Sequence, residues 1–137
     1  MNINIDFVNK LRNSGLRPTK QRLKICEVLF NTEKTFHFTV NDLSKIISEK
    51  LNQKISLATV YNTVHAFKKK GYLKEISMNS DKTYFDTNTS HHHHFFDSST
   101  KELTDLSDDQ VEKIKINKVL PGKKISSVEV LVKVENE

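Results

Sequence analysis

The segment from Ser56 to Gly71, SLATVYNTVHAFKKKG, restricts the fold of this chain more than any other. Its apolar residues recur at intervals of three and four, the spacing of one face of an α-helix. Ser56 is a residue type that caps the beginning of a helix, and Gly71 is one that ends it. Thr39 stands in the same way before VNDLSKIISEKL, which has similar spacing. We expect two successive helices that form a helix-turn-helix.

Further elements are predicted on both sides of this pair. NIDFVNKLRNSG indicates a helix that ends at Gly15, and Thr19 is the expected N-cap of a helix over KQRLKICEVLF. Residues 31–38, NTEKTFHF, are expected to form a loop. After the helices, YLKEISM and TYFDT flank the polar turn NSDK and predict a two-stranded hairpin. Helices followed by a hairpin describe a winged helix, which we place at residues 1–87.

Residues 88–137 are predicted to form a second, smaller domain. Ser107 is expected to begin a short helix through DDQVEKIKINKVL, which Pro121 and Gly122 end. Valines at alternate positions from 128 to 134 predict a half-buried strand. About 50 residues bury little apolar surface by themselves, so dimerisation through shared strands is expected. The fold class is therefore predicted to be α+β, with a small αβ dimerisation domain after the winged helix.

Composition restricts the class of protein. With 36% apolar and 28% charged residues the chain has a globular composition, and it has no apolar run of the roughly 20 residues that span a bilayer. The first residues lack the apolar core of a secretory signal, so we expect a cytoplasmic protein without a membrane partner. A single cysteine, Cys26, excludes an intramolecular disulfide and a structural zinc site of four cysteines. A bound metal must therefore use histidine and carboxylate ligands.

Charge is divided unevenly along the chain. Residues 1–76 contain fourteen lysines and arginines and six acidic residues, a net charge of +8. Residues 77–137 contain eight lysines and eleven acidic residues, a net charge of −3. A basic first part indicates a polyanionic partner. The outer face of the second predicted helix of the pair suits a major groove, because its side chains are small or hydrogen-bonding. They are Ala58, Thr59, Asn62, Thr63, His65, Ala66 and Lys69, and a merely solvated helix face remains the alternative.

Four consecutive histidines, His91 to His94, lie in TNTSHHHHFFDSS. Alternate residues of a strand point to opposite faces, so at most two of the four can bind one ion. The pair is either His91 with His93 or His92 with His94, and other segments must supply the remaining ligands. A polar solvated loop is the alternative to a metal or haem site.

Four stretches, in this order and spacing, resemble the ferric uptake regulator family of bacterial metal-sensing repressors. They are GLRPTKQRLKICEVLF, HFTVNDLSKII, ISLATVYNTVHAFKKKGYLKEI and KTYFDTNTSHHHHFF. Within that family, SLATVYNT, KTYFDTNTS and the unbroken histidine run are most similar to the iron response regulator branch. The resemblance implies a dimer that binds AT-rich operators in double-stranded DNA and senses a metal or haem.

The resemblance also assigns roles to residues. Tyr61 and Asn62 match positions that contact bases and phosphates, although Tyr61 can instead close the core. Arg17 matches a basic residue that enters the minor groove. The remaining candidates for DNA contact are Thr19, Lys20, Arg22 and Thr59, for which surface solvation is the alternative.

For the sensory metal the resemblance implies ligands from several segments. They are His37, Asp86, His92, His93, His94 and Asp105. These ligand types suit Zn²⁺, Fe²⁺ or Mn²⁺. A second site of the family would combine a cluster histidine with Glu112 and a later histidine, but no histidine follows His94. Haem is the alternative ligand of His91, His92, His93 and His94.

The predicted function is a homodimeric, metal- or haem-responsive transcriptional regulator, mainly a repressor, of iron and haem homeostasis genes. Two alternatives are a small zinc-dependent hydrolase with histidine and aspartate ligands and a metal-buffering protein. The chain contains no HExxH or nucleophile motif, so we do not expect an enzyme.

Overall fold

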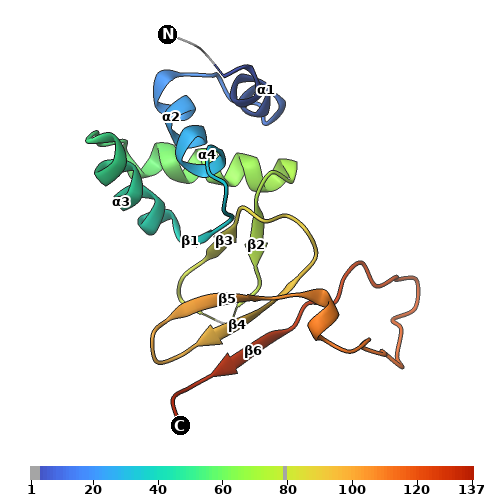
Figure 1. Ribbon diagram of the computed structural model, residues 1–137. Coiled ribbons are helices and arrows are strands. Elements are labelled where there is room, and N and C mark those ends of the chain that lie inside the picture. The colour runs from blue at the N-terminus through green and yellow to red at the C-terminus, as the bar shows by residue number, and fades with distance from the viewer. Residues whose placement is uncertain (1–3, 79) are drawn as a thin grey trace. The chain divides into compact units, whose positions relative to one another are not determined.

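The computed structural model describes residues 4–78 and 80–137. The chain divides into two compact units, Met1–Thr89 and Ser90–Glu137. The first contains four α-helices and a three-stranded sheet, and the second is built on another three-stranded sheet (Figure 1). The α+β class is therefore confirmed, while the roles assigned to residues 1–87 and 88–137 stay predictions. None of the helices in the described part of the chain has the length and apolar character needed to cross a membrane.

Three of the four helices described in the first unit, α2 to α4, begin after the capping residues predicted for them. The four helices are α1 (Ile5–Asn13), α2 (Lys20–Phe30), α3 (Val40–Leu51) and α4 (Leu57–Lys70). The Thr19 hydroxyl accepts the N–H of Arg22 at 3.3 Å, and the Ser56 hydroxyl accepts that of Thr59 at 3.2 Å. Thr39 and Asp42 exchange two bonds of 3.1 Å, a capping box. After α4, Gly71 has φ +92°, a left-handed conformation that suits glycine.

The helices of the first unit enclose one apolar core. The face of α4 contributes Val60, Val64 and Phe67, all fully buried. The Phe67 ring contacts Phe30 of α2 with ring centroids 5.5 Å apart. The other buried members include Leu11, Ile25, Leu29, Phe38, Leu43, Ile47 and Phe85. The periodicity of each helix is thus explained by burial of one face.

A small sheet completes the first unit. Strands β2 (Lys74–Ile76) and β3 (Tyr84–Asp86) form the predicted antiparallel hairpin, although Asn79 of the predicted turn lies outside the described residues. The prediction of a loop over residues 31–38 was wrong at its end, where His37–Phe38 forms β1. This strand pairs with β3, so the sheet order is β1-β3-β2. Two residues are too few to show the alternation of a strand in the sequence. His37–Phe38 is a strand only because it pairs with the distant strand β3.

The second unit is a sheet in the order β5-β4-β6. Its strands are β4 (His93–Asp97), β5 (Glu102–Leu106) and β6 (Leu131–Val134), and a single 3₁₀ turn, η1 (Asp108–Gln110), follows β5. Strand β5 runs antiparallel to β4, whereas β6 runs parallel to it. The last residue of β5 and the first residue of β6 therefore lie at the same end of the sheet, on either side of β4.

The prediction of a helix from Ser107 through residue 120 was wrong. Only Asp108–Gln110 is helical, and the segment that follows has no regular structure as far as Leu131. Helices of this length depend on burying an apolar face, and here Ile114, Ile116, Val119 and Leu120 are exposed. The strand predicted from the alternating valines is confirmed only from Leu131 to Val134, where pairing with β4 supports it.

Cys26 of α2 is a core residue, and its burial raises the pKa of the thiol from 9.0 to about 12, against a smaller lowering effect of Lys10. Because the folded state favours the neutral thiol, this stabilisation is complete below pH 9 and is lost as the pH rises towards 12. We expect Cys26 of the folded protein to resist iodoacetamide at about pH 8 and to react after unfolding in urea. Mass spectrometry of the alkylated chain checks this, with Cys26→Ser as the baseline. Equal alkylation rates with and without urea would contradict it.

Candidate functional site

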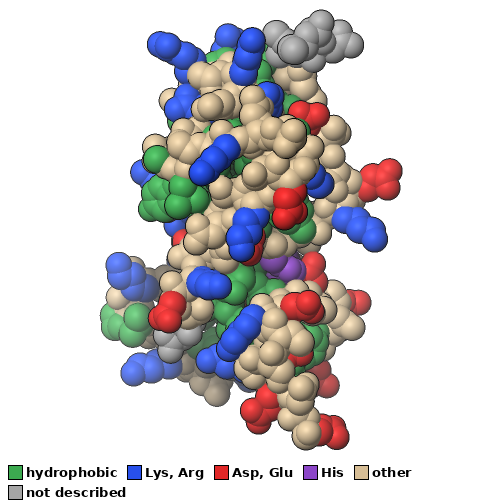
Figure 2. Space-filling model, turned by 90° about the vertical axis from the view of Figure 1, so that its left-hand side faces the viewer, with side chains coloured by type: hydrophobic (Ala, Val, Ile, Leu, Met, Phe, Trp, Pro, Cys, Tyr) green, Lys and Arg blue, Asp and Glu red, His purple; other side chains and the backbone are tan. Residues whose placement is uncertain are grey.

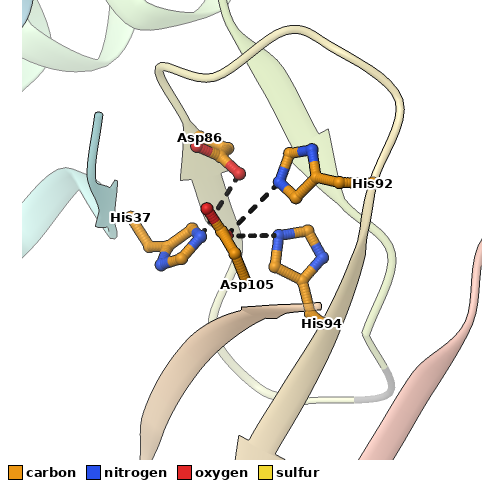
Figure 3. A group of neighbouring side chains, drawn as sticks. All are labelled: His37, Asp86, His92, His94 and Asp105. Atoms are coloured by element: carbon orange, nitrogen blue, oxygen red, sulfur yellow. Dashed lines mark ion pairs between the residues drawn. The ribbon is translucent and has the colours of Figure 1, made fainter. Parts of the chain in front are cut away.

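A histidine and an aspartate face each other across the sheet of the first unit. His37 of β1 lies directly opposite Asp86 of β3, so their side chains project from the same face. The distance from His37 Nε2 to Asp86 Oδ2 is 3.2 Å, and Figure 3 shows the two side chains pointing toward one another. Asp86 is buried and also accepts the N–H of Asn88 at 2.9 Å. A buried carboxylate requires a positive partner, which a protonated imidazole or a metal cation supplies.

The second unit contains another group on one face of its sheet. His94 of β4 is directly opposite Asp105 of β5, and His92 lies two residues before His94, on the same side. Nε2 of His92 is 3.4 Å, and Nε2 of His94 is 3.6 Å, from the same oxygen, Oδ1 of Asp105. Figure 3 shows both imidazole rings turned toward that carboxylate. Two imidazole nitrogens and a carboxylate oxygen therefore converge within this unit.

The proton on His92 is placed by its neighbour. Nδ1 of His92 lies 2.7 Å from the carbonyl oxygen of Ser90, which can only accept a hydrogen bond. Nδ1 therefore carries the ring proton, and Nε2 of the neutral ring presents a lone pair to Asp105. A lone pair and a carboxylate at 3.4 Å repel each other unless a proton or a metal cation lies between them. The donor set and its tautomer thus fit a cation, and histidine ligands of metals commonly donate their other N–H to a carbonyl.

The other two histidines lie on the opposite face and meet a different acid. His91 Nδ1 and His93 Nε2 are 3.3 and 3.0 Å from Oδ1 of Asp108, the first residue of η1. The N–H of Val130 donates to His93 Nδ1 at 2.9 Å, so the neutral His93 ring carries its proton on Nε2 and donates it to Asp108. A proton at Nε2 occupies the position that a metal would need. The structure therefore does not bring His93 together with His92 and His94, because the strand places it on the other face.

The sequence offered little sign that Asp108 would meet His91 and His93. It is fifteen residues from His93, and no local motif joins the two. With Glu112, it lines a cavity of about 390 Å³ beside His91 and His93. The one available signal was the acidic run after Ser107, which was read as the first turn of a helix. Register between β4 and β5 explains the placement, since His93 is opposite Leu106 and Asp108 lies two residues further on.

On α4, the residues that project outward are not all those predicted. Tyr61 is 50% exposed and Asn62 is exposed, so Tyr61 does not close the core. Thr63, by contrast, is buried, and its hydroxyl donates to the carbonyl of Thr59 at 2.7 Å. Its placement on the outer face was wrong, because Thr63 is three residues after Val60 and four before Phe67 and therefore shares their buried face. Thr59 is half-buried, and its hydroxyl shares a hydrogen bond of 2.8 Å with Ser56.

The candidate DNA contacts near α2 lie on the surface. Arg17, Thr19 and Lys20 are exposed, and Arg22 is half-buried. Arg22 donates from Nη1 to the carbonyl oxygen of Arg17 at 3.0 Å, which orders the turn before α2. In the face that Figure 2 shows, lysine and arginine side chains project from many points of the first unit. Residues 1–89 contain fifteen lysines and arginines and eight acidic residues, a net charge of +7.

Comparison with known proteins adds independent evidence. Residues 13–133 match the model of the "Ferric uptake regulator family". The chain is 36% identical over 81 residues to a ferric uptake regulation protein of Yersinia pestis, covering 59% of this chain and 53% of that protein. It is 34% identical over 85 residues to the peroxide operon regulator of Bacillus subtilis, covering 62% of this chain and 57% of that protein. The chain thus matches little more than half the length of these relatives.

Solved structures agree with the family match. The ferric uptake regulator of Vibrio cholerae superposes with a TM-score of 0.71 at 25% identity, covering 94% of this chain and 98% of that one. The regulator of Pseudomonas aeruginosa with manganese has a TM-score of 0.68 at 21% identity, covering 96% and 98%, which shows a shared fold. Because the family model matches nearly the whole sequence, the chain belongs to the ferric uptake regulator family.

Proposed function

We propose that this protein is a metal-responsive transcriptional regulator that binds an AT-rich DNA operator as a dimer. Its first unit acts as a winged helix-turn-helix that reads DNA, and its second unit dimerises and holds part of the metal site. The observation that carries the proposal is the arrangement at Asp105, where His92 Nε2 presents a lone pair to a carboxylate. That arrangement fits a metal cation, and the family match supplies the connection between metal and transcription.

Contact with DNA is supported by the surface of α4 and by charge. Tyr61 and Asn62 project from a helix whose last turn carries three lysines, Lys68, Lys69 and Lys70. Amide and phenol groups hydrogen-bond to base edges in a major groove, and lysines contact phosphates. The net charge of +7 over residues 1–89 suits a polyanion. Arg17, Thr19, Lys20, Arg22 and Thr59 are the further candidate contacts.

We propose further that the two histidine–aspartate groups bind one ion together. His37 with Asp86 offers two ligands and His92, His94 and Asp105 offer three, while a structural zinc site usually takes four from the protein. The two groups are close in the chain, because the six residues from Asp86 to His92 span at most about 22 Å. An ion held by both would restrain the angle between the units and shift the population towards one arrangement.

A second copy of the chain is the partner that the second unit needs. In the described part of that unit, the buried apolar residue is Leu106, accompanied by the buried histidines. Several large apolar side chains between β5 and β6 are exposed instead. They are Ile114, Ile116, Val119, Leu120 and Ile125. Burial of these side chains against another copy would supply the core that one copy lacks.

Within the family we propose the iron response regulator branch, because of SLATVYNT, KTYFDTNTS and the unbroken histidine run. Regulation of iron and haem genes follows from that assignment. Haem is then a second ligand to test, with His91, His92, His93 and His94 as its candidate residues. The structure favours a metal at His92 and His94, because their Nε2 atoms already face a carboxylate.

Fluorescence anisotropy of a labelled AT-rich palindromic duplex tests the function. We expect tighter binding than to a scrambled duplex of equal composition, and a change of at least about fivefold on adding Mn²⁺ or Zn²⁺, as for coupled sites generally. Parallel titrations with haem and with hydrogen peroxide test the ligand of the proposed branch and the response named by the peroxide relative. Equal affinity for both duplexes would refute operator recognition. An affinity unchanged by every additive would refute sensing, and metal uptake without DNA binding would indicate a buffering protein.

A further inference from the structure

Tyr61 is the most exposed aromatic side chain on α4, yet it is not isolated. Its ring lies against that of His65, one turn later on the helix, with centroids 4.5 Å apart and an interplanar angle of 42°. Residues four apart on a helix are surface neighbours, and the contact keeps the phenol beside the helix. His65 is half-buried, so its ring lies between the exposed phenol and the interior.

The far side of His65 meets a fixed part of the core. Its ring lies edge-on to Phe85 of β3, with centroids 6.4 Å apart and an angle of 73°. Phe85 is buried, pairs across the sheet with both Phe38 and Glu75, and stacks on Phe38 at 5.8 Å. Phe85 therefore cannot move without the sheet. The aromatic series Phe85, His65 and Tyr61 extends from a rigid core to the surface of α4.

We propose that His65 is a positioning residue that holds the Tyr61 ring in the orientation in which it contacts DNA. The inference rests on the proposed function, because it concerns how the DNA-reading helix is prepared. An exposed side chain that is ordered before binding loses less conformational entropy when it meets its partner. His65 thus acts through Tyr61, and its contribution should disappear when the phenol is absent.

A double-mutant cycle on operator affinity tests this. We expect His65→Ala to weaken binding of the AT-rich palindrome by about three- to tenfold, the cost of ordering one side chain. His65→Phe should restore affinity to within about twofold, because it keeps a ring between Phe85 and Tyr61. In a Tyr61→Ala background, His65→Ala should change affinity by less than about twofold, since coupled residues are not additive. Affinity for the scrambled duplex should stay the same in all variants.

Other outcomes overturn the inference. Equal losses from His65→Ala in both backgrounds would mean that His65 contacts DNA itself or supports the fold. A His65→Phe variant as weak as His65→Ala would mean that the imidazole nitrogens, not the ring, matter. NMR of the DNA-free protein distinguishes failure of the positioning role of His65 from failure of the proposed function. The Tyr61 ring resonances should shift when His65 is replaced by alanine, and unchanged resonances would refute positioning even if the protein binds no operator.

Discussion

Replacing His37 with alanine should weaken binding of Mn²⁺ and Zn²⁺ by at least about tenfold, and up to about 100-fold. Loss of a residue that only orients a ligand costs this much in metal sites, and a ligand itself costs no less. Without His37, Asp86 remains a buried carboxylate that has lost its imidazole partner. Isothermal titration of the metal-free protein with each ion measures the effect. It tests the joined site directly, because His37 belongs to the first unit and the histidine run to the second.

His65→Ala is the matched control for metal binding, since it removes the other histidine of the first unit. It should leave affinity for both ions within about twofold of the original protein. If His37→Ala also binds both ions unchanged, the site is confined to His92, His94 and Asp105, and the proposal of one shared ion is wrong. If haem binding persists in His37→Ala while metal binding is lost, the two ligands use different residues.

Replacing Phe67 with alanine should lower the free energy of unfolding of the first unit by about 3–5 kcal/mol, the usual cost for a buried phenylalanine. Phe67 is fully buried, and its ring meets Phe30 at 5.5 Å and Tyr72 at 6.1 Å. Alanine leaves a cavity between α2 and α4 that neither neighbouring ring can fill without moving a helix. Urea unfolding followed by circular dichroism at the helical band measures the change.

Lys69→Ala is the control on the same helix, because Lys69 is exposed and such substitutions usually change stability by less than about 0.5 kcal/mol. A domain with total stability of about 5–15 kcal/mol can fail to fold after the larger loss. Phe67→Leu keeps part of the side chain and should give an intermediate value. A loss below about 1 kcal/mol for Phe67→Ala would show that this core is not packed as described.

Local chemistry predicted the helices of the first unit well. Thr19, Thr39 and Ser56 each cap the helix that the sequence assigned to them, because capping depends only on residues within one turn. Leu57 and Tyr61 share the three- and four-residue spacing of the apolar residues of α4, yet both are exposed. They lie at the edge of the apolar face, where periodicity alone does not separate core from surface.

The second unit was predicted less well. A helix was expected from Ser107 to residue 120, but the apolar side chains of that segment, among them Ile114 and Leu120, are exposed and stabilise no helix by burial. The strand at Leu131–Val134 was recognisable, while its parallel pairing with β4 was not. Both failures have the same cause, since long-range pairing and burial decide short segments of weak local preference.

For the histidine run, the sequence alone determined that four residues separate into two alternating pairs, because a strand has a period of two. Only the tertiary structure decided which acid each pair meets. The register of β4 with β5 places Asp105 beside His92 and His94, and the chain continuing from β5 places Asp108 beside His91 and His93. Backbone partners then set the ring protons. The Ser90 carbonyl accepts from Nδ1 of His92, so Nε2 of the neutral ring carries a lone pair, and the Val130 N–H donates to Nδ1 of His93, so its Nε2 proton is donated to Asp108. Such partners come from pairing between distant strands, which no local pattern encodes.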